Sequence, residues 1–381
     1  MVGSRFGVDL GPTSRHEFLM GAMLNEQWAG FLTNAGGSME AGEIRSFRGD
    51  TGLHHARSGC FVCDLSGYAL AAFVGLDAEA FLHGQLSNDV KALSHDQSQV
   101  AAYNTPKGRI LATMLLWRNA DGFLAQLPGA IAPGILKRLS MFILRSKVKA
   151  TDASDRYVRF GLGGPTAAQI ASAAGVLVTT GDFKVLGSHG GEHPVQPDFV
   201  LGLPSGRFEF LYSDVQAAMA CWNALCARGA KPAGMAPWHW LSVQSGIAEI
   251  CPETQDKFVP QMLNLELVGG VSFNKGCYPG QEIVARTQYR GEIKRRTVLA
   301  HVDSKPVPAV GEDVINAESP EQSIGSLVAV APSPTGGYDA LACLHMDLAR
   351  DGELHLGEAH GPRLHLKDLP YKLPSLSKPC A

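Results

Sequence analysis

The sequence predicts an α+β protein of two to three domains that ends in a small β-barrel or sandwich. The chain has 381 residues, which is more than one ordinary hydrophobic core accommodates. Before residue 297 the predicted strands and helices do not alternate strictly, which disfavours a parallel α/β sheet. After Arg296 the pattern changes to short strands between Gly, Pro and Asp turns, which is typical of a small all-β domain.

The composition is that of a soluble globular protein, with 45% hydrophobic and 18% charged residues. Because no run of about 18 apolar residues occurs, we expect no membrane span and no membrane partner. The net charge of −3 offers no general attraction for polyanions, so we expect no direct DNA binding.

The cysteines and the N-terminus predict a cytoplasmic protein. Eight cysteines at irregular spacing are typical of reduced thiols rather than of a disulfide framework. The N-terminus lacks the charged-then-apolar order of a secretory signal, and its acidic residues argue against a mitochondrial transit peptide. Residues 1–50 are rich in glycine and weakly patterned, so we interpret them as a loosely packed extension with a possible short helix near 17–31.

The middle of the chain contains the clearest patterns. Strands are predicted at 68–74, 99–103, 109–117, 123–127, 147–150, 157–162 and 207–212, and a turn at Thr105–Gly108 joins the second and third of them. Helices are predicted from an Asp77 cap to about 86, within 130–144, from Pro165 to 170, from a capping box of Ser213 and Gln216 to Gly229, and from Pro237 to 247. The C-terminal strands are predicted at 297–302, 323–330, 340–344 and 353–356.

The stretch 275–286 reads KGCYPGQEIVAR and places Cys277 just before a predicted short helix that starts at Gln281 and ends near Gly291. A thiol near a helix N-terminus and close to Lys275 lies where the thiolate is favoured over the thiol. The alternative is a tight turn with a half-buried cysteine, and the residue chemistry alone leaves the two interpretations open.

Other chemistry-bearing residues are weaker candidates. Cys60 and Cys63 have no second pair to complete a metal site, so we predict that they are core residues and that the chain has no metal site. The amides of Gln261 and Asn264 could recognise a heterocycle or could simply form loop hydrogen bonds. A basic run of Arg290, Lys294, Arg295 and Arg296 is either a solvated surface or a site for a phosphate or carboxylate.

The 275–282 stretch resembles the signature of the YgfZ family of folate-binding proteins, which are relatives of the aminomethyltransferase (T-protein) of the glycine cleavage system. Stretches at 75–82, 86–90, 107–109 and 258–265 agree with this resemblance, which covers roughly residues 50–300. It implies a GcvT-like three-domain cloverleaf around a central channel. Its parts would be an extension at 1–50, a folate-binding region of two interleaved α+β subdomains at 51–296, and a C-terminal β-barrel at 297–381.

The resemblance also implies a function and a set of site residues. The implied ligand is tetrahydrofolate or another reduced folate, and the implied partners are iron–sulfur client enzymes or assembly proteins, including enzymes that thiolate tRNA. Cys277 would be the key thiol, and the rest of the signature is Lys275, Gly276, Tyr278, Gly280, Gln281, Glu282 and Arg286. The implied folate-binding residues are Tyr68, Asn88, Gln261 and Asn264.

The chain departs from the T-protein pattern at two places. Where T-proteins have acidic residues beside the folate, residues 109–113 have no carboxylate, and 199–204 lack both Tyr and Glu. We therefore expect a folate pocket with a thiol beside it and no general base. An accessory role is favoured over a tetrahydrofolate-dependent aminomethyltransferase, and an interaction module without ligand is the third hypothesis. Whether the protein turns over a substrate stays open.

Overall fold

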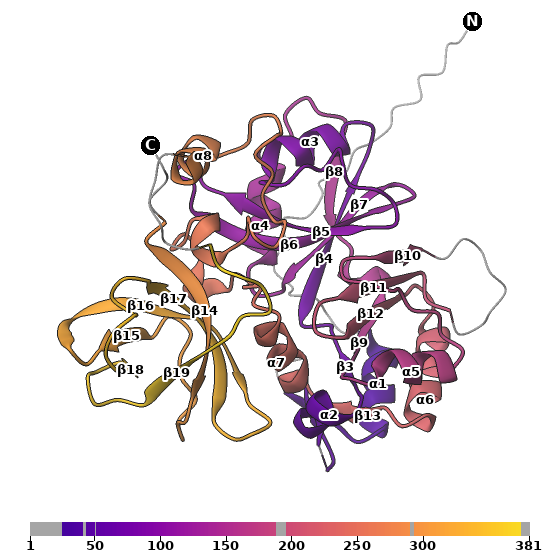
Figure 1. Ribbon diagram of the computed structural model, residues 1–381. Coiled ribbons are helices and arrows are strands. Elements are labelled where there is room, and N and C mark those ends of the chain that lie inside the picture. The colour runs from indigo at the N-terminus through magenta and orange to yellow at the C-terminus, as the bar shows by residue number, and fades with distance from the viewer. Residues whose placement is uncertain (1–24, 41–42, 50, 188–195, 290–292, 375–381) are drawn as a thin grey trace, which may run out of the picture.

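The computed structural model describes residues 25–40, 43–49, 51–187, 196–289 and 293–374. Three lobes meet around a common centre, with the C-terminal barrel on one side and two sheet-containing lobes on the other (Figure 1). Among these described residues, no helix is long and apolar enough to cross a membrane.

The first lobe is a five-stranded antiparallel sheet in the order β5-β6-β7-β4-β8. Its strands are β4 (Tyr68–Val74), β5 (Ser98–Asn104), β6 (Ile110–Asn119), β7 (Gly122–Pro128) and β8 (Lys149–Asp152), and its helices are α3 (Ala78–Gln85) and α4 (Ala132–Ser140). These elements confirm the predicted strands and helices. Asp77 precedes α3 as predicted, but its side chain makes no capping bond and instead accepts from the backbone N–H of Lys147 at 2.6 Å.

The second lobe is a six-stranded sheet in the order β10-β11-β12-β9-β3-β13. Its strands are β3 (Phe61–Asp64), β9 (Val158–Gly163), β10 (Val185–Gly187), β11 (Phe199–Leu203), β12 (Arg207–Tyr212) and β13 (Lys231–Ala233). Its helices are α2 (Gly52–Ser58), α5 (Ala167–Ala173), α6 (Val215–Ala227) and α7 (Ala236–Gln244), with the 3-10 turn η1 (Ser154–Arg156) before β9. The chain leaves this sheet after β3, builds the whole first sheet, and returns at β9.

The start of α6 corrects the predicted capping box. The N-cap is Asp214 rather than Ser213, and its side chain accepts from the backbone N–H groups of Gln216 and Ala217. A carboxylate one residue later satisfies the same unpaired donors, so the hydroxyl of Ser213 is not needed. Gly229, with φ of +110°, follows the helix end as predicted.

The N-terminal segment is more structured than the sequence predicts. Helix α1 (Glu26–Asn34) and the hairpin of β1 (Gly37–Glu40) and β2 (Glu43–Phe47) pack on the second lobe. Trp28 is buried and donates from Nε1 to Asp64 Oδ1 at 2.8 Å. The description as a loose extension is therefore wrong for residues 26–34, because a buried tryptophan anchors the helix. The predicted helix near 17–31 lies partly outside the described residues.

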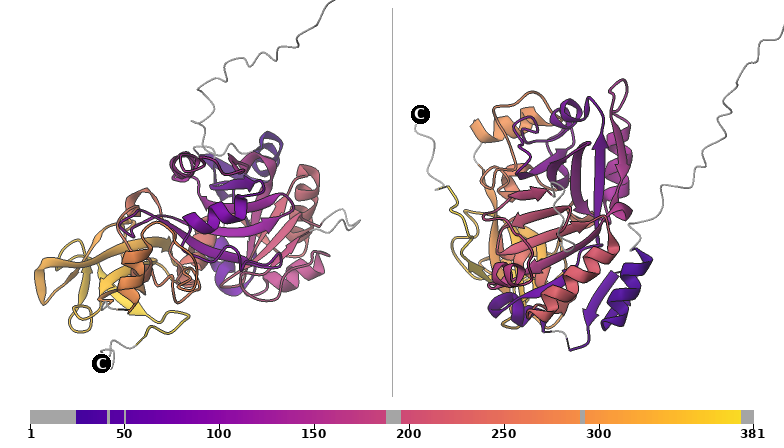
Figure 2. Two further views of the ribbon diagram at one scale, coloured as in Figure 1. Left: turned by 90° about the horizontal axis from the view of Figure 1, so that it is seen from above. Right: turned by 90° about the vertical axis from the view of Figure 1, so that its right-hand side faces the viewer.

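The C-terminal lobe is a closed barrel in the order β14-β17-β16-β15-β18-β19, which confirms the predicted β-barrel. The strands are β14 (Arg295–Val302), β15 (Asp313–Asn316), β16 (Ser319–Pro332), β17 (Tyr338–His345), β18 (Leu354–Leu356) and β19 (Arg363–Lys367). The barrel is fixed to α7 through buried Asp339, which accepts from Trp240 Nε1 at 2.8 Å and from Gln244 Nε2 at 2.9 Å. The views in Figure 2 show the barrel beside the two sheet lobes.

Between the second lobe and the barrel, the chain forms the 3-10 turns η2 (Pro252–Thr254) and η3 (Pro260–Leu263) and then helix α8 (Gln281–Tyr289). The observed helix confirms the predicted start at Gln281. It packs against η3 and the first lobe, so the 275–286 stretch lies at the side of the molecule that carries α3 (Figure 1).

Candidate functional site

Cys277 is exposed in the loop that leads into α8. The loop is held from within, because Gln281 Nε2 donates to the carbonyl of Lys275 at 3.4 Å and Tyr278 is buried. Burial raises the pKa of Tyr278 to about 12, so its hydroxyl stays protonated. The structure thus presents the thiol to solvent on a fixed turn.

The turn at Thr105–Arg109 packs directly on the start of α8. Gly280 has φ of +79°, and a Cβ there would lie 2.5 Å from Gly108 Cα and 2.5 Å from the carbonyl oxygen of Thr105. Gly108 also has positive φ, at +71°. Both positions therefore need glycine, since a side chain would be strained and would push the two segments apart. This contact brings together two of the stretches that carry the family resemblance.

The ammonium of Lys275 points at the end of α3. Its Nζ donates to the carbonyls of His83 and Leu86, the latter at 2.6 Å, and lies 4.9 Å from the centre of the Tyr278 ring. Carbonyls at a helix C-terminus attract a cation. Burial nevertheless lowers the pKa of Lys275 to about 8, because no carboxylate contacts it closely enough to offset desolvation.

His83 also faces the Cys277 loop, and the sequence patterns gave no reason to select it. Its Nε2 would lie 3.6 Å from a Cβ placed on Gly276. Its Nδ1 is 3.2 Å from Asp89 Oδ1 but outside hydrogen-bonding geometry. Burial and the nearby Lys275 lower the pKa of His83, so the imidazole is predominantly neutral at pH 7.

The other two charged residues of the signature form an exposed pair. Arg286 and Glu282 are 3.2 Å apart, four residues apart on α8, and both side chains are well exposed. Pairs of this kind stabilise a protein by only a few tenths of a kcal/mol, about 0.3–0.5.

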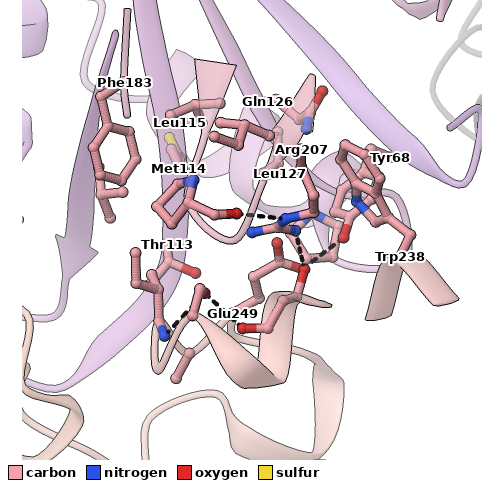
Figure 3. A pocket seen from close by; sticks show the side chains of 18 residues that line it. Tyr68, Thr113, Met114, Leu115, Gln126, Leu127, Phe183, Arg207, Trp238 and Glu249 are labelled. Carbon is pink, nitrogen blue, oxygen red and sulfur yellow. Dashed lines mark hydrogen bonds between the residues drawn. The ribbon is translucent and has the colours of Figure 1, made fainter. Parts of the chain in front are cut away.

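A cavity lies at the centre of the molecule, where the lobes meet (Figure 3). It has two adjoining parts of about 70 and 260 Å³. The smaller part is walled by the first two lobes and α7, and the larger reaches β16 of the barrel. Both parts are lined by Tyr68, Pro128, Ser242, Ile247 and Glu249. This cavity corresponds to the central channel that the family resemblance implies.

Tyr68 and Glu249 form the polar centre of the cavity. The Tyr68 hydroxyl donates to Glu249 Oε2 at 2.9 Å, and no described residue donates to Glu249 Oε1. The Glu249 side chain is exposed, because it faces the open space of the cavity, although many protein atoms lie around it. Burial raises the pKa of both groups, so the phenol remains protonated and donates to the carboxyl group.

A cation and an aromatic ring complete the wall. The guanidinium of Arg207 is 5.0 Å from the centre of the Trp238 ring, donates from Nε to the carbonyl of Pro204 at 3.0 Å, and also donates to Ser242 Oγ. The arrangement of Trp238, Arg207, Tyr68 and Glu249 around one space is visible in Figure 3. A site of this kind suits a flat, polar heterocycle.

A second carboxyl group lies just behind the cavity wall. Glu209 is fully buried and accepts from Gln126 Nε2 at 2.9 Å, and Gln126 in turn accepts from Arg159 at 3.2 Å. Burial raises the pKa of Glu209 to about 7 even though Arg159 opposes the shift. The expectation of a cavity without a carboxyl group is wrong, because Glu249 lines it. Glu249 and the buried Glu209 behind the wall come from segments other than 109–113 and 199–204.

The four expected folate-binding residues do not lie together. Tyr68 lines the cavity, whereas Asn88, Gln261 and Asn264 line neither part of it. Each of these three amides donates to the backbone instead. Asn88 donates to the carbonyls of Val100 and Gly269, Gln261 to that of Val284, and Asn264 to that of Thr297. Cys277 does not line the cavity either; the cysteine that does is Cys251, in the larger part. The roles of the three amides in folate binding stay predictions.

Arg296 of the basic run and the cysteine pair are buried structural groups, whereas Lys294 and Arg295 are exposed. Arg296 is buried and forms an ion pair with Glu266, so it is not available to hold a ligand phosphate, and Arg290 lies outside the described residues. Cys60 and Cys63 are buried, and burial raises the pKa of both thiols. Within the described part of the chain, no group of three His, Cys, Asp or Glu side chains could hold a metal ion.

Comparison with known proteins agrees with this architecture. Residues 50–275 match the family model of the GCVT N-terminal domain. The glycine cleavage system aminomethyltransferase T from Bartonella henselae has the same fold, with a TM-score of 0.71 at 19% identity over 89% of this chain and 95% of that one. The fold and the central cavity thus define a protein of the GcvT-like class.

Two relatives are more specific. The chain is 29% identical to the tRNA-modifying protein YgfZ of Edwardsiella ictaluri (strain 93-146) over 298 residues, 78% of this chain and 88% of the relative. It is 30% identical to the protein of the same name from Yersinia enterocolitica (serotype O:8) over 315 residues, 81% of this chain and 92% of the relative. The chain belongs to the YgfZ family.

Proposed function

We propose that this protein is a cytoplasmic accessory factor that binds a reduced folate and supports the assembly or repair of iron–sulfur enzymes, including those that thiolate tRNA. The observation that carries the proposal is the central cavity, where Tyr68, Arg207, Trp238 and Glu249 surround one space. The two YgfZ relatives are named tRNA-modifying proteins, which supports the tRNA context.

The cavity residues match the chemistry of a pterin. A pterin has a flat ring with adjacent N–H donors on one edge, and a carboxylate is the side chain that accepts two such donors at once. Glu249 Oε1 accepts no hydrogen bond from a described residue, and Oε2 accepts from Tyr68 alone, so both oxygens keep lone pairs that can accept from that edge. Trp238 and Tyr68 add aromatic surface, and Arg207 adds a donor for the ring carbonyl.

Calorimetry with tetrahydrofolate and with 5-formyltetrahydrofolate tests the folate part. We expect binding to the wild-type protein and a loss of about 10- to 100-fold in Glu249→Gln, because a charge-assisted hydrogen bond is replaced by a neutral one. Cys277→Ala is the matched control and should bind as the wild type does, since Cys277 lies outside the cavity lining. Absence of both heat and a thermal shift with the wild type would favour an interaction module without ligand.

We infer that Cys277 is the working thiol of the accessory role. The support is its exposure on a fixed turn beside Lys275 and His83. In a strain that lacks the gene, the wild type should restore iron–sulfur enzyme activity and Cys277→Ser should not. Full rescue by Cys277→Ser would overturn this role while leaving the folate result intact.

The position of Glu249 keeps a second candidate function open. A carboxyl group in the cavity supplies the acid/base group that an aminomethyltransferase needs, which the sequence pattern did not reveal. Folate-dependent turnover of an aminomethylated lipoyl carrier distinguishes the two functions. Turnover that is lost in Glu249→Gln would replace the accessory role with the transferase.

A further inference from the structure

An exposed apolar patch lies at the end of the first lobe, away from the cavity. It consists of Leu76, Met141, Phe142 and Leu144, whose exposed fractions are 86%, 61%, 46% and 85%. Leu76 lies in the turn between β4 and α3, and the other three lie in the loop between α4 and β8. Single exposed apolar residues are common, but several together on adjacent loops indicate a binding surface.

The two loops are fixed to each other and to the core. The backbone N–H of Asp77 donates to the carbonyl of Lys147 at 3.2 Å, and the Asp77 carboxylate accepts from the N–H of Lys147 at 2.6 Å. Ile143 and Val148 of the same loop pack against the core of the first lobe. The exposed residues of the patch therefore lie on the same loops as residues that are packed in the core. The loops are held in place, so the patch has a fixed shape before a partner binds.

Positive charge borders the patch. Lys137, Arg145, Lys147 and Lys149 are exposed, and none of them forms an ion pair with another described residue. Residues 122–151 contain no Asp or Glu, and beside Leu76 the carboxylates of Asp77 and Glu79 already accept from the Lys147 N–H and from Arg118. A partner for this surface must therefore bring its own carboxylates, because only these would complement the basic border.

We propose that the patch docks a protein partner through an amphipathic segment whose apolar side chains are flanked by acidic ones. Met, Phe and Arg are residue types enriched in protein–protein interfaces. Leucine side chains add nothing to phosphate binding, which disfavours RNA. The patch lies on two loops rather than on an amphipathic helix, and it has no Trp or Tyr, both of which disfavour a membrane surface.

The patch lies near the Cys277 loop, which connects it to the proposed function. The inference that the partner is an iron–sulfur client enzyme rests on that proposed function. Helix α3 starts two residues after Leu76, and its last turn holds Lys275 next to Cys277. An eight-residue helix is about 12 Å long. A protein docked on the patch would therefore lie within one short helix of the exposed thiol.

Site-specific photocrosslinking in cells tests the docking surface. The full-length protein would carry p-benzoylphenylalanine in place of Leu144, with the same replacement at Leu177 as a control. Leu177 is 68% exposed in the second lobe, and residues 171–183 contain no Lys or Arg. A second version would add Arg145→Glu and Lys149→Glu, two exposed changes that leave the bonds of Asp77 and Lys147 in place.

We expect residue 144 to crosslink to a protein at a segment that contains both Asp or Glu and apolar residues. The yield should fall about tenfold on charge reversal, because like charges then face each other. The proposal would be overturned if residue 144 gave no crosslink, or crosslinked to lipid, to RNA or to a segment without Asp or Glu. It would also be overturned by an equal yield from residue 177 or by an unchanged yield after charge reversal. Thermal unfolding of the variants, expected to be unchanged, shows that the fold is intact.

The result is separable from that of the proposed function. Folate binding and rescue of iron–sulfur enzymes by the wild type decide the proposed function, whatever the crosslink shows. If the wild type fails both tests but residue 144 still crosslinks to an acidic amphipathic segment, the docking surface stands and its partner is not an iron–sulfur client. If the wild type passes and the crosslink fails, only the docking surface falls.

Discussion

Replacing Gly280 by alanine tests how the Cys277 loop is held. Its φ of +79° costs an alanine roughly 1–2 kcal/mol. The new Cβ would also lie 2.5–2.6 Å from three backbone atoms of the Thr105–Gly108 turn, where ordinary contacts begin near 3.4 Å. Moving two backbone segments apart by almost 1 Å adds about 1–3 kcal/mol. We therefore expect Gly280→Ala to lower the free energy of unfolding by about 2–5 kcal/mol.

Alanine variants of two other glycines, Gly108 and Gly134, allow the stability changes at three positions to be compared. Gly108 has φ of +71°, and its Cβ would lie 3.0 Å from Ile283 Cβ and 3.3 Å from the carbonyl oxygen of Gly280. This overlap is smaller than at Gly280, so Gly108→Ala should cost about 1–3 kcal/mol. Gly134 lies inside α4 with no atom within 4 Å of a Cβ, so Gly134→Ala should stabilise by about 0.5–1 kcal/mol. Urea unfolding followed by fluorescence gives all three values. If Gly280→Ala falls within about 0.5 kcal/mol of the wild type, the backbone contact does not constrain the loop.

Three further outcomes follow from burial and pKa values. Lys275, whose pKa is lowered to about 8, should be reductively methylated at pH 8 faster than the exposed Lys107, and an equal rate measured by mass spectrometry would contradict that shift. Glu209 has a folded-state pKa of about 7, above its usual 4.5, so its contribution to stability is full below pH 4.5 and is lost as the pH rises to about 7. The free energy of unfolding of the wild type should therefore fall relative to Glu209→Gln across that window, and parallel curves in urea titrations would refute the assignment. Iodoacetamide should alkylate exposed Cys277 in the folded protein well before buried Cys343, and peptide mapping that finds the reverse order would place the thiol elsewhere.

Much of the local structure follows from the sequence because it depends on neighbouring residues. The apolar strand that begins at Tyr68, the helix that begins at Gln281 and the small barrel were all predictable from apolar runs and turn residues. The predicted cap at Ser213 was wrong by one residue, because Asp214 offers the same unpaired N–H groups a competing acceptor. Family membership was also readable, since it rests on the contiguous stretch 275–282.

The cavity is a different case, because its lining residues come from many separate segments, as four of them illustrate. Tyr68 is on β4, Arg207 on β12, Trp238 on α7 and Glu249 in the loop that follows α7. Nothing in the sequence near Glu249 distinguishes it from a surface glutamate. Only folding surrounds it with protein, raises its pKa and places the Tyr68 hydroxyl 2.9 Å away.

By itself, the sequence therefore determined most of the elements, the family and the place of Cys277 just before a short helix. The tertiary structure alone decided which carboxyl groups lie at the centre, that Lys275 points at the end of α3, and that Gly108 meets Gly280. The physical reason is that periodicity, caps and turns depend on neighbours in the chain. Desolvation and close backbone contact depend on segments that lie more than 100 residues apart and meet only in the folded molecule.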